Sequence, residues 1–372
     1  MLVGIPKEIK DNEYRVGLAP ESVREVVAHG HEVIVETNAG GGIGASDDDY
    51  RRAGAGIVDT ADEVFARADM VVKVKEPQAN ERAMLREGQI LYTYLHLAPD
   101  PEQTKDLVDS GAVCIAYETV TSPHGGLPLL RPMSEVAGRM SIQAAAHSLE
   151  KTHGGIGMLM GGVPGVDPAK VVVIGGGVVG THAAHIAVGM GADVWVLDRS
   201  NDSLGRLWTH FGRSINTVYS TRDAIERHVI EADVVIGGVL VPGAAAPKLV
   251  TAEHVKAMKP GAVMVDVAID QGGCFETSHA TTHSDPTYVV DDVVHYCVAN
   301  MPGGVPRTST FALNNATLGG ALALADKGYK QALTDDPHLR NGLNVHHGDI
   351  TCKEVADDLG YDYVEPLAAM AK

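Results

Sequence analysis

Apolar runs and amphipathic stretches alternate along the first third of the chain. Short runs rich in β-branched residues predict strands, and apolar residues spaced three or four apart predict helices. The expected strands are Leu2–Ile5, His31–Thr37, Met70–Val74, Gln89–Leu95 and Ala112–Tyr117. The expected helices are Pro20–His29, Ala61–Ala68, Ala79–Glu87 and Pro101–Ser110. Strands that alternate with helices in this way indicate βαβ units and a parallel sheet.

The same alternation returns in the second half of the chain. A helix is expected over Pro132–Lys151, and the strands expected after it are Lys170–Ile174, Ala192–Leu197, Asp233–Ile236, Ala262–Val267 and Val294–Ala299. The tail shows helical patterns at Ala312–Leu333 and Ile350–Leu359. Because the tail shows no strand pattern, we expect it to dock as helices on the rest of the fold.

A glycine-rich loop directly follows the Lys170–Ile174 strand. Gly175, Gly177 and Gly180 form the pattern G-x-G-x-x-G, and an Ala-rich helical stretch follows. In a dinucleotide site the first glycine permits the tight turn, the second admits the pyrophosphate, and the third lets the helix pack on the strand. The next strand ends on Asp198, where an acid can bond the ribose 2′-hydroxyl. We therefore expect NAD as cofactor.

Two alternatives to NAD need weighing. The glycines could serve packing alone in a unit without a nucleotide, but strand, glycines, helix, strand and acid in register favour a binding site. Arg199 leaves room for the 2′-phosphate of NADP. Asp198 would repel that phosphate while bonding a free hydroxyl, so NAD is favoured.

These elements predict an α/β fold with two Rossmann-like parallel-sheet domains separated by a cleft, the dinucleotide domain being inserted into the substrate domain. Glycine and proline at Gly126-Leu127-Pro128 and Pro302-Gly303-Gly304-Val305-Pro306 are typical of linkers. We therefore expect a substrate domain of residues 1–128 plus 307–372 and an NAD-binding domain of residues 129–306.

Composition narrows the class of protein. The net charge of −18, from 30 basic and 48 acidic residues, argues against nucleic-acid and anionic-membrane partners. No apolar window is long enough for a membrane span, and no signal peptide is recognised at the start. The four cysteines are scattered without a C-x-x-C pattern, so we expect buried, reduced thiols, no metal site and a cytoplasmic protein.

Candidate chemistry lies where the expected strands end, because ligands bind outside the carboxyl ends of strands in such sheets. Arg15 follows the first strand, Lys75 and His96 end two others, and Asp270 follows a strand of the second half. Arginine and lysine suit an anionic substrate, and histidine can transfer a proton near neutral pH. By position alone, each could instead be a solvated, capping or structural residue.

Longer motifs point to one family. The chain closely resembles the bacterial alanine dehydrogenases, which share a superfamily with the NAD-binding subunit of proton-translocating transhydrogenase. The motifs that carry the resemblance are Val3–Glu8, Asn12–Val16, Val74–Pro77, Tyr94–Ala98, Tyr117–Thr119, Pro132–Arg139, Gly161–Val166, Val241–Gly243, Ala268–Gly273, Val298–Pro302 and Thr308–Thr310.

The resemblance implies roles for matching positions. Arg15 and Lys75 would bind the substrate carboxylate and carbonyl, while His96 and Asp270 would act as acid–base groups. The implied NAD site comprises Ser134, Gly175, Gly177, Val178, Val179, Gly180, Asp198, Ser220, Val239, Leu240, Val267, Ala268, Ile269, Asp270, Val298, Asn300 and Met301. Many relatives carry a basic residue where this chain has Ser203, and often arginine where it has His279, so those two cofactor contacts are in doubt.

The activity that the resemblance implies is reversible NAD-dependent oxidative deamination of L-alanine to pyruvate and ammonium, in a homohexamer. A transhydrogenase NAD subunit, a non-catalytic NAD-binding regulator and a saccharopine dehydrogenase are the alternatives. The Ala-Ile-Asp-Gln-Gly-Gly motif around Asp270 fits the dehydrogenases better than the transhydrogenase subunit. A regulator that only binds NAD would have no need of His96 and Asp270 as a pair of acid–base groups.

Overall fold

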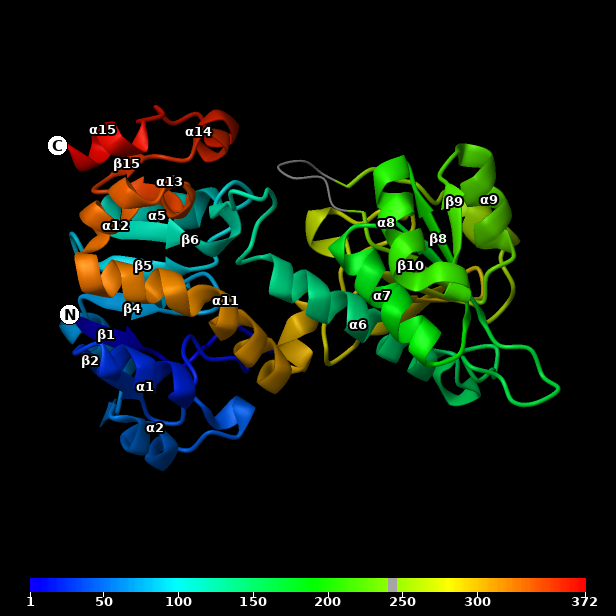
Figure 1. The fold of residues 1–372 in the computed structure, drawn as a ribbon, viewed down its shortest axis with the longest axis horizontal. Coiled ribbons are helices and arrows are strands. Elements are labelled where there is room, and N and C mark those ends of the chain that lie inside the picture. Colours follow the sequence, from blue (N-terminus) through cyan, green and yellow to red (C-terminus); the bar gives the residue numbers. More distant parts are fainter. Residues whose placement is uncertain (240–245) are drawn as a thin grey trace. The chain divides into compact units, whose positions relative to one another are not determined.

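The computed structural model describes residues 1–239 and 246–372. The chain forms two compact units, the first made of Met1–Met133 with Gly303–Lys372 and the second of Ser134–Pro302 (Figure 1). Each unit contains one mostly parallel sheet with helices, so the predicted α/β class with two such sheets is confirmed. The predicted domain boundaries fall after residues 128 and 306, a few residues from the ends of these units.

The sheet of the first unit has the strand order β15-β14-β6-β5-β4-β1-β2-β3. Its parallel strands are β1 (Leu2–Ile5), β2 (Glu32–Glu36), β3 (Gly56–Val58), β4 (Met70–Val72), β5 (Ile90–Thr93) and β6 (Val113–Ala116). All of these except the short β3 were predicted from the sequence. In chain order, β2 and β3 are added on one side of β1, and β4 is added on its other side. Doubly wound sheets bind their ligands at such a change of side, which here lies between β1 and β4.

The expectation that the tail has no strands is wrong. β14 (Leu343–His346) pairs antiparallel with β6, and β15 (Asp349–Ile350) pairs antiparallel with β14. All four residues of β14 are buried, although two of them, Asn344 and His346, are polar. Such a short segment with alternate polar residues carries no clear strand signal, and its pairing with the edge strand β6 decides the outcome.

The first unit also contains helices, and residues next to them in the sequence determine where they begin and end. For example, the Asp100 carboxylate caps α5 (Pro101–Ser110) by accepting from the Gln103 N–H at 3.0 Å, and Gly111 ends it at φ 67°. The predicted helix at Ala79–Glu87 is reduced to a single turn. The remaining helices are α1 (Pro20–Ala28), α2 (Asp47–Ala53), α3 (Ala61–Arg67), α4 (Ala79–Arg82), α11 (Pro306–Lys327), α12 (Tyr329–Asp335), α13 (Pro337–Arg340), α14 (Lys353–Leu359) and α15 (Pro366–Met370).

The sheet of the second unit has the order β12-β13-β11-β10-β7-β8-β9. Its strands are β7 (Lys170–Ile174), β8 (Asp193–Asp198), β9 (Asn216–Tyr219), β10 (Val234–Gly237), β11 (Val263–Asp266), β12 (Thr287–Val290) and β13 (Val293–Tyr296). Among the described strands of this sheet, β12 alone runs antiparallel to its neighbour. The edge strands β9 and β12 were not predicted; each has only four residues, none of them fully buried, and so lacks the buried apolar run of the central strands. In this sheet the corresponding change of side lies between β7 and β10.

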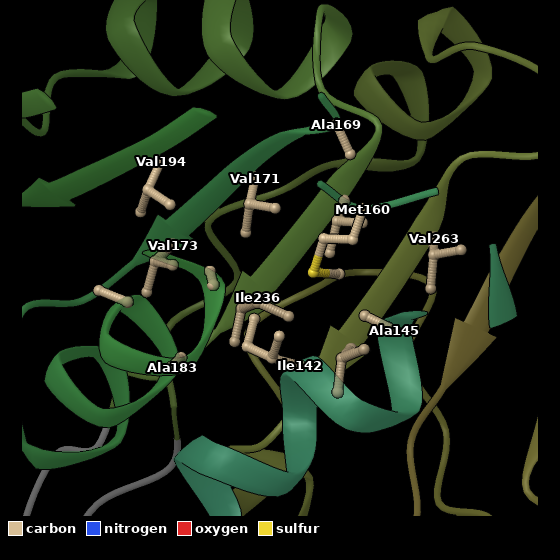
Figure 2. Packing of buried hydrophobic residues seen from close by; sticks show 14 of the residues in the cluster. Ile142, Ala145, Met160, Ala169, Val171, Val173, Ala183, Val194, Ile236 and Val263 are labelled. Atoms are coloured by element: carbon tan, nitrogen blue, oxygen red, sulfur yellow. The ribbon is translucent and has the colours of Figure 1, made fainter. Parts of the chain in front are cut away.

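One of the hydrophobic clusters of the second unit lies between this sheet and two helices. Ile142 and Ala145 of α6 (Arg131–Ser148) and Ala183 of α7 (Val178–Gly189) pack with Val173 of β7 and Ile236 of β10 (Figure 2). All of these side chains are buried. The other helices of the unit are α8 (Asn201–Phe211), α9 (Arg222–Ile230) and α10 (Ala252–Ala257).

Two expectations about the whole chain can be compared with the structure. The four cysteines Cys114, Cys274, Cys297 and Cys352 are free and buried, as predicted. Among residues 1–239 and 246–372, no helix is both long and apolar enough to cross a membrane.

Candidate active site

The first unit gathers ionisable side chains at one edge of its sheet. β1, β4, β5 and β6 are neighbouring parallel strands, so the segments that follow them start from the same edge. Arg15 follows β1, Lys75 follows β4, His96 follows β5 and Glu118 follows β6. The predicted substrate-binding and acid–base residues of this unit therefore come from adjacent positions of the fold.

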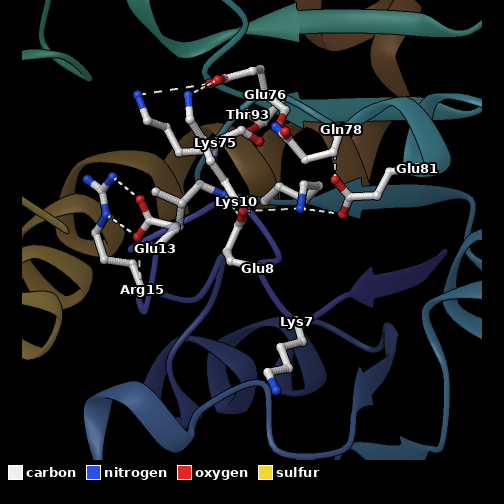
Figure 3. A network of polar contacts seen from close by, with 12 residues as sticks. Lys7, Glu8, Lys10, Glu13, Arg15, Lys75, Glu76, Gln78, Glu81 and Thr93 are labelled. Carbon is white, nitrogen blue, oxygen red and sulfur yellow. Dashed lines mark hydrogen bonds and ion pairs between the residues drawn. The ribbon is translucent and has the colours of Figure 1, made fainter. Parts of the chain in front are cut away.

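Arg15 is buried, with its side chain 2% exposed. Its Nε donates to Oε1 of Glu13 at 2.7 Å and its Nη2 to Oε2 of Glu13 at 2.5 Å (Figure 3). Its Nη1 donates to Sδ of Met133 at 2.9 Å. Burial alone would lower the Arg15 pKa, but the Glu13 carboxylate outweighs it and the pKa is raised. The guanidinium is thus a permanent buried cation, unlike the solvated surface arginine considered from the sequence.

The loop that carries Arg15 is fixed by the tail helix α11. The Val16 N–H donates to Oγ1 of Thr310 at 3.3 Å. Asn314 bridges the loop twice, accepting from the Ala19 N–H at 2.6 Å and donating to the Gly17 carbonyl at 2.9 Å. The expectation that the tail docks on the fold is confirmed here, and the tail holds the segment that presents Arg15.

Lys75 is mostly buried and lies beside an acid that it shares with a second lysine. Its Nζ lies 3.9 Å from Oε2 of Glu76, and Lys10 binds Oε1 of the same carboxylate (Figure 3). Burial would raise the Glu76 pKa, but the two ammonium groups together lower it. The two lysines thus surround a single acid at the carboxyl edge of the sheet.

A fully buried lysine lies beneath this edge and was missed by sequence reasoning. Lys73 Nζ lies 2.7 Å from Oε1 of Glu81 and 3.2 Å from Oε2 of Glu8. Burial opposes its charge, yet the two acids raise the Lys73 pKa. Oε1 of Glu8 also accepts from the Val74 N–H at 2.6 Å, which ties the segment before Lys75 to the loop after β1. A lysine inside the apolar run Met70–Val74 was the available signal for such a buried pair.

His96 adopts a left-handed backbone at φ 51°, and Glu118 supports it. One Glu118 oxygen accepts from the His96 N–H at 2.6 Å and lies 3.8 Å from Nδ1 of the same residue. The imidazole stacks on Tyr94 with ring centroids 5.8 Å apart and planes 5° apart. Tyr94 is anchored by its hydroxyl, which donates to the Leu129 carbonyl at 2.6 Å. The ring is 43% exposed, so it is oriented and still accessible.

In the second unit the glycine loop has the geometry that a dinucleotide site needs. Gly175 has φ 104°, and a Cβ there would lie 2.8 Å from the Gly238 carbonyl oxygen of the loop after β10. A Cβ on Gly180 would overlap the Gly175 carbonyl oxygen, so this glycine lets α7 pack on the loop. A Cβ on Gly177 would meet no described atom within 4 Å. Packing therefore explains two of the glycines, and among the described residues nothing fills the space beside Gly177.

Asp198 ends β8 beside this loop. Its Oδ2 accepts from the Gly176 N–H at 2.5 Å and its Oδ1 from the Ser200 N–H at 2.7 Å. The Ser220 N–H donates to the Asp198 backbone carbonyl at 2.9 Å, which brings Ser220 to the same edge. Among the described residues no side chain caps the start of α7. A bare helix N-terminus, an open glycine and a nearby acid fit the pyrophosphate and ribose of NAD.

The other expected cofactor residues come from several elements of the second unit. Val178 and Val179 begin α7, Ser134 lies in the first turn of α6, Val239 follows β10, and Val267, Ala268, Ile269 and Asp270 follow β11. Asp270 is exposed. Val298 and Met301 are buried in the core, and Asn300 has φ 59°. Leu240 and the Val241–Gly243 motif lie outside the described residues.

The two doubtful positions are engaged within the protein. Oγ of Ser203 accepts from Nη2 of Arg206 at 2.8 Å. The His279 ring stacks on Tyr288 with centroids 3.6 Å apart, and its backbone N–H donates to the Tyr288 hydroxyl at 3.0 Å. That Ser203 and His279 lack the cofactor contacts expected in relatives stays a prediction.

Comparison with known proteins covers the whole chain. Residues 4–137 match the family described as "Alanine dehydrogenase/PNT, N-terminal domain", and residues 141–353 match "Alanine dehydrogenase/PNT, C-terminal domain". The chain is 60% identical over 365 residues to the alanine dehydrogenase of Halomonas elongata, covering 98% of both chains. It is 54% identical over 371 residues to that of Mycolicibacterium smegmatis, covering 100% of both.

Solved structures are similar along the same length. An L-alanine dehydrogenase superposes with a TM-score of 0.94 at 52% identity, covering 97% of this chain and 99% of that one. A transhydrogenase from Sinorhizobium meliloti superposes with a TM-score of 0.81 at 26% identity, covering 94% and 98%. With both domain models matched in order and full-length relatives above half identity, this chain belongs to the alanine dehydrogenase/PNT family.

Proposed function

We propose that this chain catalyses the reversible NAD-dependent oxidative deamination of L-alanine to pyruvate and ammonium. The observation that carries the proposal is the placement of Arg15, Lys75 and His96 after adjacent parallel strands of the first unit. Such a set combines anion binding with proton transfer at one sheet edge. The full-length identity to alanine dehydrogenases supports alanine as the substrate.

Arg15 and Lys75 are the proposed groups that hold the substrate. The Glu13 carboxylate fixes two of the guanidinium nitrogens, so the third, Nη1, is presented in a defined direction. Nη1 donates to the Met133 thioether, which is a weak acceptor. A substrate carboxylate oxygen is a stronger acceptor and would displace the sulfur. Lys75 then supplies a positive charge to the carbonyl oxygen of pyruvate.

His96 and Asp270 are the proposed proton carriers. The reaction forms an imino acid when the Cα–H bond breaks, water adds to the imino carbon, and the carbinolamine releases ammonium. Each of the last two steps moves a proton between oxygen or nitrogen and a base. The Tyr94 ring and Glu118 orient the His96 imidazole without enclosing it, so it can exchange protons with substrate and solvent.

The glycine loop and Asp198 are the proposed grip on the cofactor. NAD, when bound, takes up the hydride that leaves Cα. The first turn of α7 presents its N–H groups to the pyrophosphate, and Gly177 leaves room for it. Asp198 accepts from the ribose hydroxyls and repels a 2′-phosphate.

We further propose a cytoplasmic, homohexameric enzyme. Four free cysteines fit a reducing compartment, and the hexamer is what the resemblance to alanine dehydrogenases implies.

The deciding experiment follows NADH absorbance with purified protein and a panel of amino acids, each with NAD or NADP. We expect NADH formation with L-alanine and NAD, and little reduction of NADP. The reverse assay supplies pyruvate, ammonium and NADH. A chain that reduces no NAD with L-alanine, and oxidises no NADH with pyruvate and ammonium, would contradict the proposal.

A further inference from the structure

A buried carboxylate lies directly beneath the loop that carries Asp270. Asp266 is the last residue of β11 and is 0% exposed. The chain then forms the short helical turn η5 (Ile269–Gln271), which contains Asp270, and returns to the sheet edge through Gly272 and Gly273. The Asp266 carboxylate therefore lies at the base of a loop whose tip carries a proposed proton carrier.

The two oxygens of Asp266 bind both ends of this loop. On the outgoing side, Oδ1 accepts from the Ala268 N–H at 3.1 Å. On the returning side, Oδ2 accepts from the Cys274 N–H at 2.9 Å, the Phe275 N–H at 3.2 Å and the Ser278 hydroxyl at 2.6 Å. One carboxylate thus closes the loop across its base.

The backbone of the loop is shaped to approach this carboxylate. Gly273 has φ 75°, and a Cβ there would lie 2.6 Å from Oδ2 of Asp266 and 3.0 Å from Cβ of Ser278. Gly272 also has a left-handed backbone, at φ 86°. Lys248 also binds the returning part of the loop, because its Nζ donates to the Gly272 carbonyl at 2.5 Å and to the Phe275 carbonyl at 3.0 Å. These contacts leave the Asp270 side chain exposed at the tip.

We propose that Asp266 is a positioning residue that sets the orientation of the Asp270 carboxylate by closing the loop of residues 267–278. The proposal rests on the role proposed above for Asp270. Backbone N–H groups and a hydroxyl, all of them donors, converge on the carboxylate, and an amide in its place would turn an NH2 group toward some of them. The loop would then relax and misplace Asp270, and a displacement of about 1 Å can cost about 100-fold in rate.

The test is a double-mutant cycle with D266N, D270N and the combined variant, measured as kcat for L-alanine oxidation at saturating NAD. We expect D266N to lower kcat by about 10-fold to 100-fold. Because Arg15 and Lys75 belong to the other unit, the KM for L-alanine should change less than threefold. If Asp266 acts through Asp270, D266N added to D270N should lower kcat less than threefold further.

A matched control is available at the opposite end of the same sheet. Asp233, just before β10, is also buried and accepts from the Lys170 N–H at 2.8 Å and from Lys259 Nζ at 2.7 Å. D233N should lower Tm and leave kcat within twofold. Should D266N fail to fold, S278A removes one contact of the same carboxylate, and its smaller loss of kcat should likewise disappear in the D270N background.

The outcomes separate this inference from the proposed function. A kcat of D266N, or of S278A where D266N does not fold, that matches the parent overturns the inference. Losses that multiply in the combined variant also overturn it, since Asp266 would then act independently of Asp270. If D270N itself retains the parent kcat, the proposed role of Asp270 fails, and the inference fails with it.

Discussion

Single residues at the sheet edges combine a fixed orientation with access to solvent. His96 is the clearest case, because its left-handed backbone, its stacking on Tyr94 and its contact with Glu118 all orient a ring that is 43% exposed. General acid–base help is worth about 100-fold to 10,000-fold. H96A should therefore lower kcat by at least about 100-fold while Tm stays near the parent value, measured by NADH absorbance and thermal unfolding.

His347 offers a matched control for that variant. It also has a left-handed backbone, at φ 47°, and its Nδ1 lies 3.7 Å from Oε1 of Glu87. It follows β14 at the antiparallel end of the sheet, away from the proposed proton transfers. H347A should keep the parent kcat. Near-normal turnover of H96A would remove His96 from the mechanism.

Asp198 allows a second prediction at the residue scale. A hydrogen bond to a charged group contributes about 1.5–3 kcal/mol, which corresponds to about 10-fold to 100-fold in affinity. D198A should raise the dissociation constant for NADH and the KM for NAD by that factor and reduce the preference for NAD over NADP, measured by NADH fluorescence and steady-state kinetics. D193A, at the amino end of the same strand, should leave both unchanged. Unchanged cofactor constants in D198A would count against the ribose assignment.

Among the elements, α11 links the end of the chain to its beginning. Asn314 is 3% exposed and binds both the Ala19 N–H and the Gly17 carbonyl of the loop that presents Arg15. Leaving such buried backbone groups unpaired costs about 1–3 kcal/mol. N314A should lower Tm and, because the loop loses its anchor, raise the KM for L-alanine more than the KM for NAD.

The neighbouring residue of the same helix serves as its control. Asn315 is exposed, so N315A should change neither Tm nor KM beyond small surface effects of about 0.5 kcal/mol. A stability loss in N314A with an unchanged KM for L-alanine would show that α11 stabilises the fold but does not affect how Arg15 binds the substrate.

At the scale of the whole molecule, buried histidines make stability depend on pH. Burial is the main cause that lowers the pKa of His228 and His295 in the second unit, and it lowers the pKa of His346 in the first unit from 6.5 to about 4. A lowered pKa means that the unfolded chain binds a proton where the folded chain does not. The stability contribution is therefore complete above pH 6.5 and is lost as the pH falls toward 4.

We expect the free energy of unfolding to decrease between pH 6.5 and pH 4, with His346 contributing at most about 3 kcal/mol of the decrease. Urea unfolding at several pH values measures this. H346Q should show a smaller decrease over that interval than the parent. An equal decrease in both proteins would exclude His346 as a source of the pH dependence.

Local sequence patterns determined most of the fold and part of the site. The strands β1, β4, β5, β7 and β11 and the helices α1 and α5 were predicted because each has an apolar period or an end signal contained within a few residues. The glycine loop and Asp198 were predicted for the same reason. The longer motifs indicated the family, and with it the proposed roles of Arg15, Lys75, His96 and Asp270.

Tertiary structure alone decided which residues surround those positions. β14 is a strand because β6 offers it an edge, and the loop that carries Arg15 is fixed because α11 binds the backbone N–H groups of Val16 and Ala19. The pairs of Lys73 with Glu8 and Glu81, and the closure of the Asp270 loop by Asp266, join residues of adjacent segments in ways that no local period encodes. The physical reason is that strand pairing and charge burial depend on partners that the fold brings in from other segments, whereas helix ends, turns and glycine loops depend on immediate neighbours.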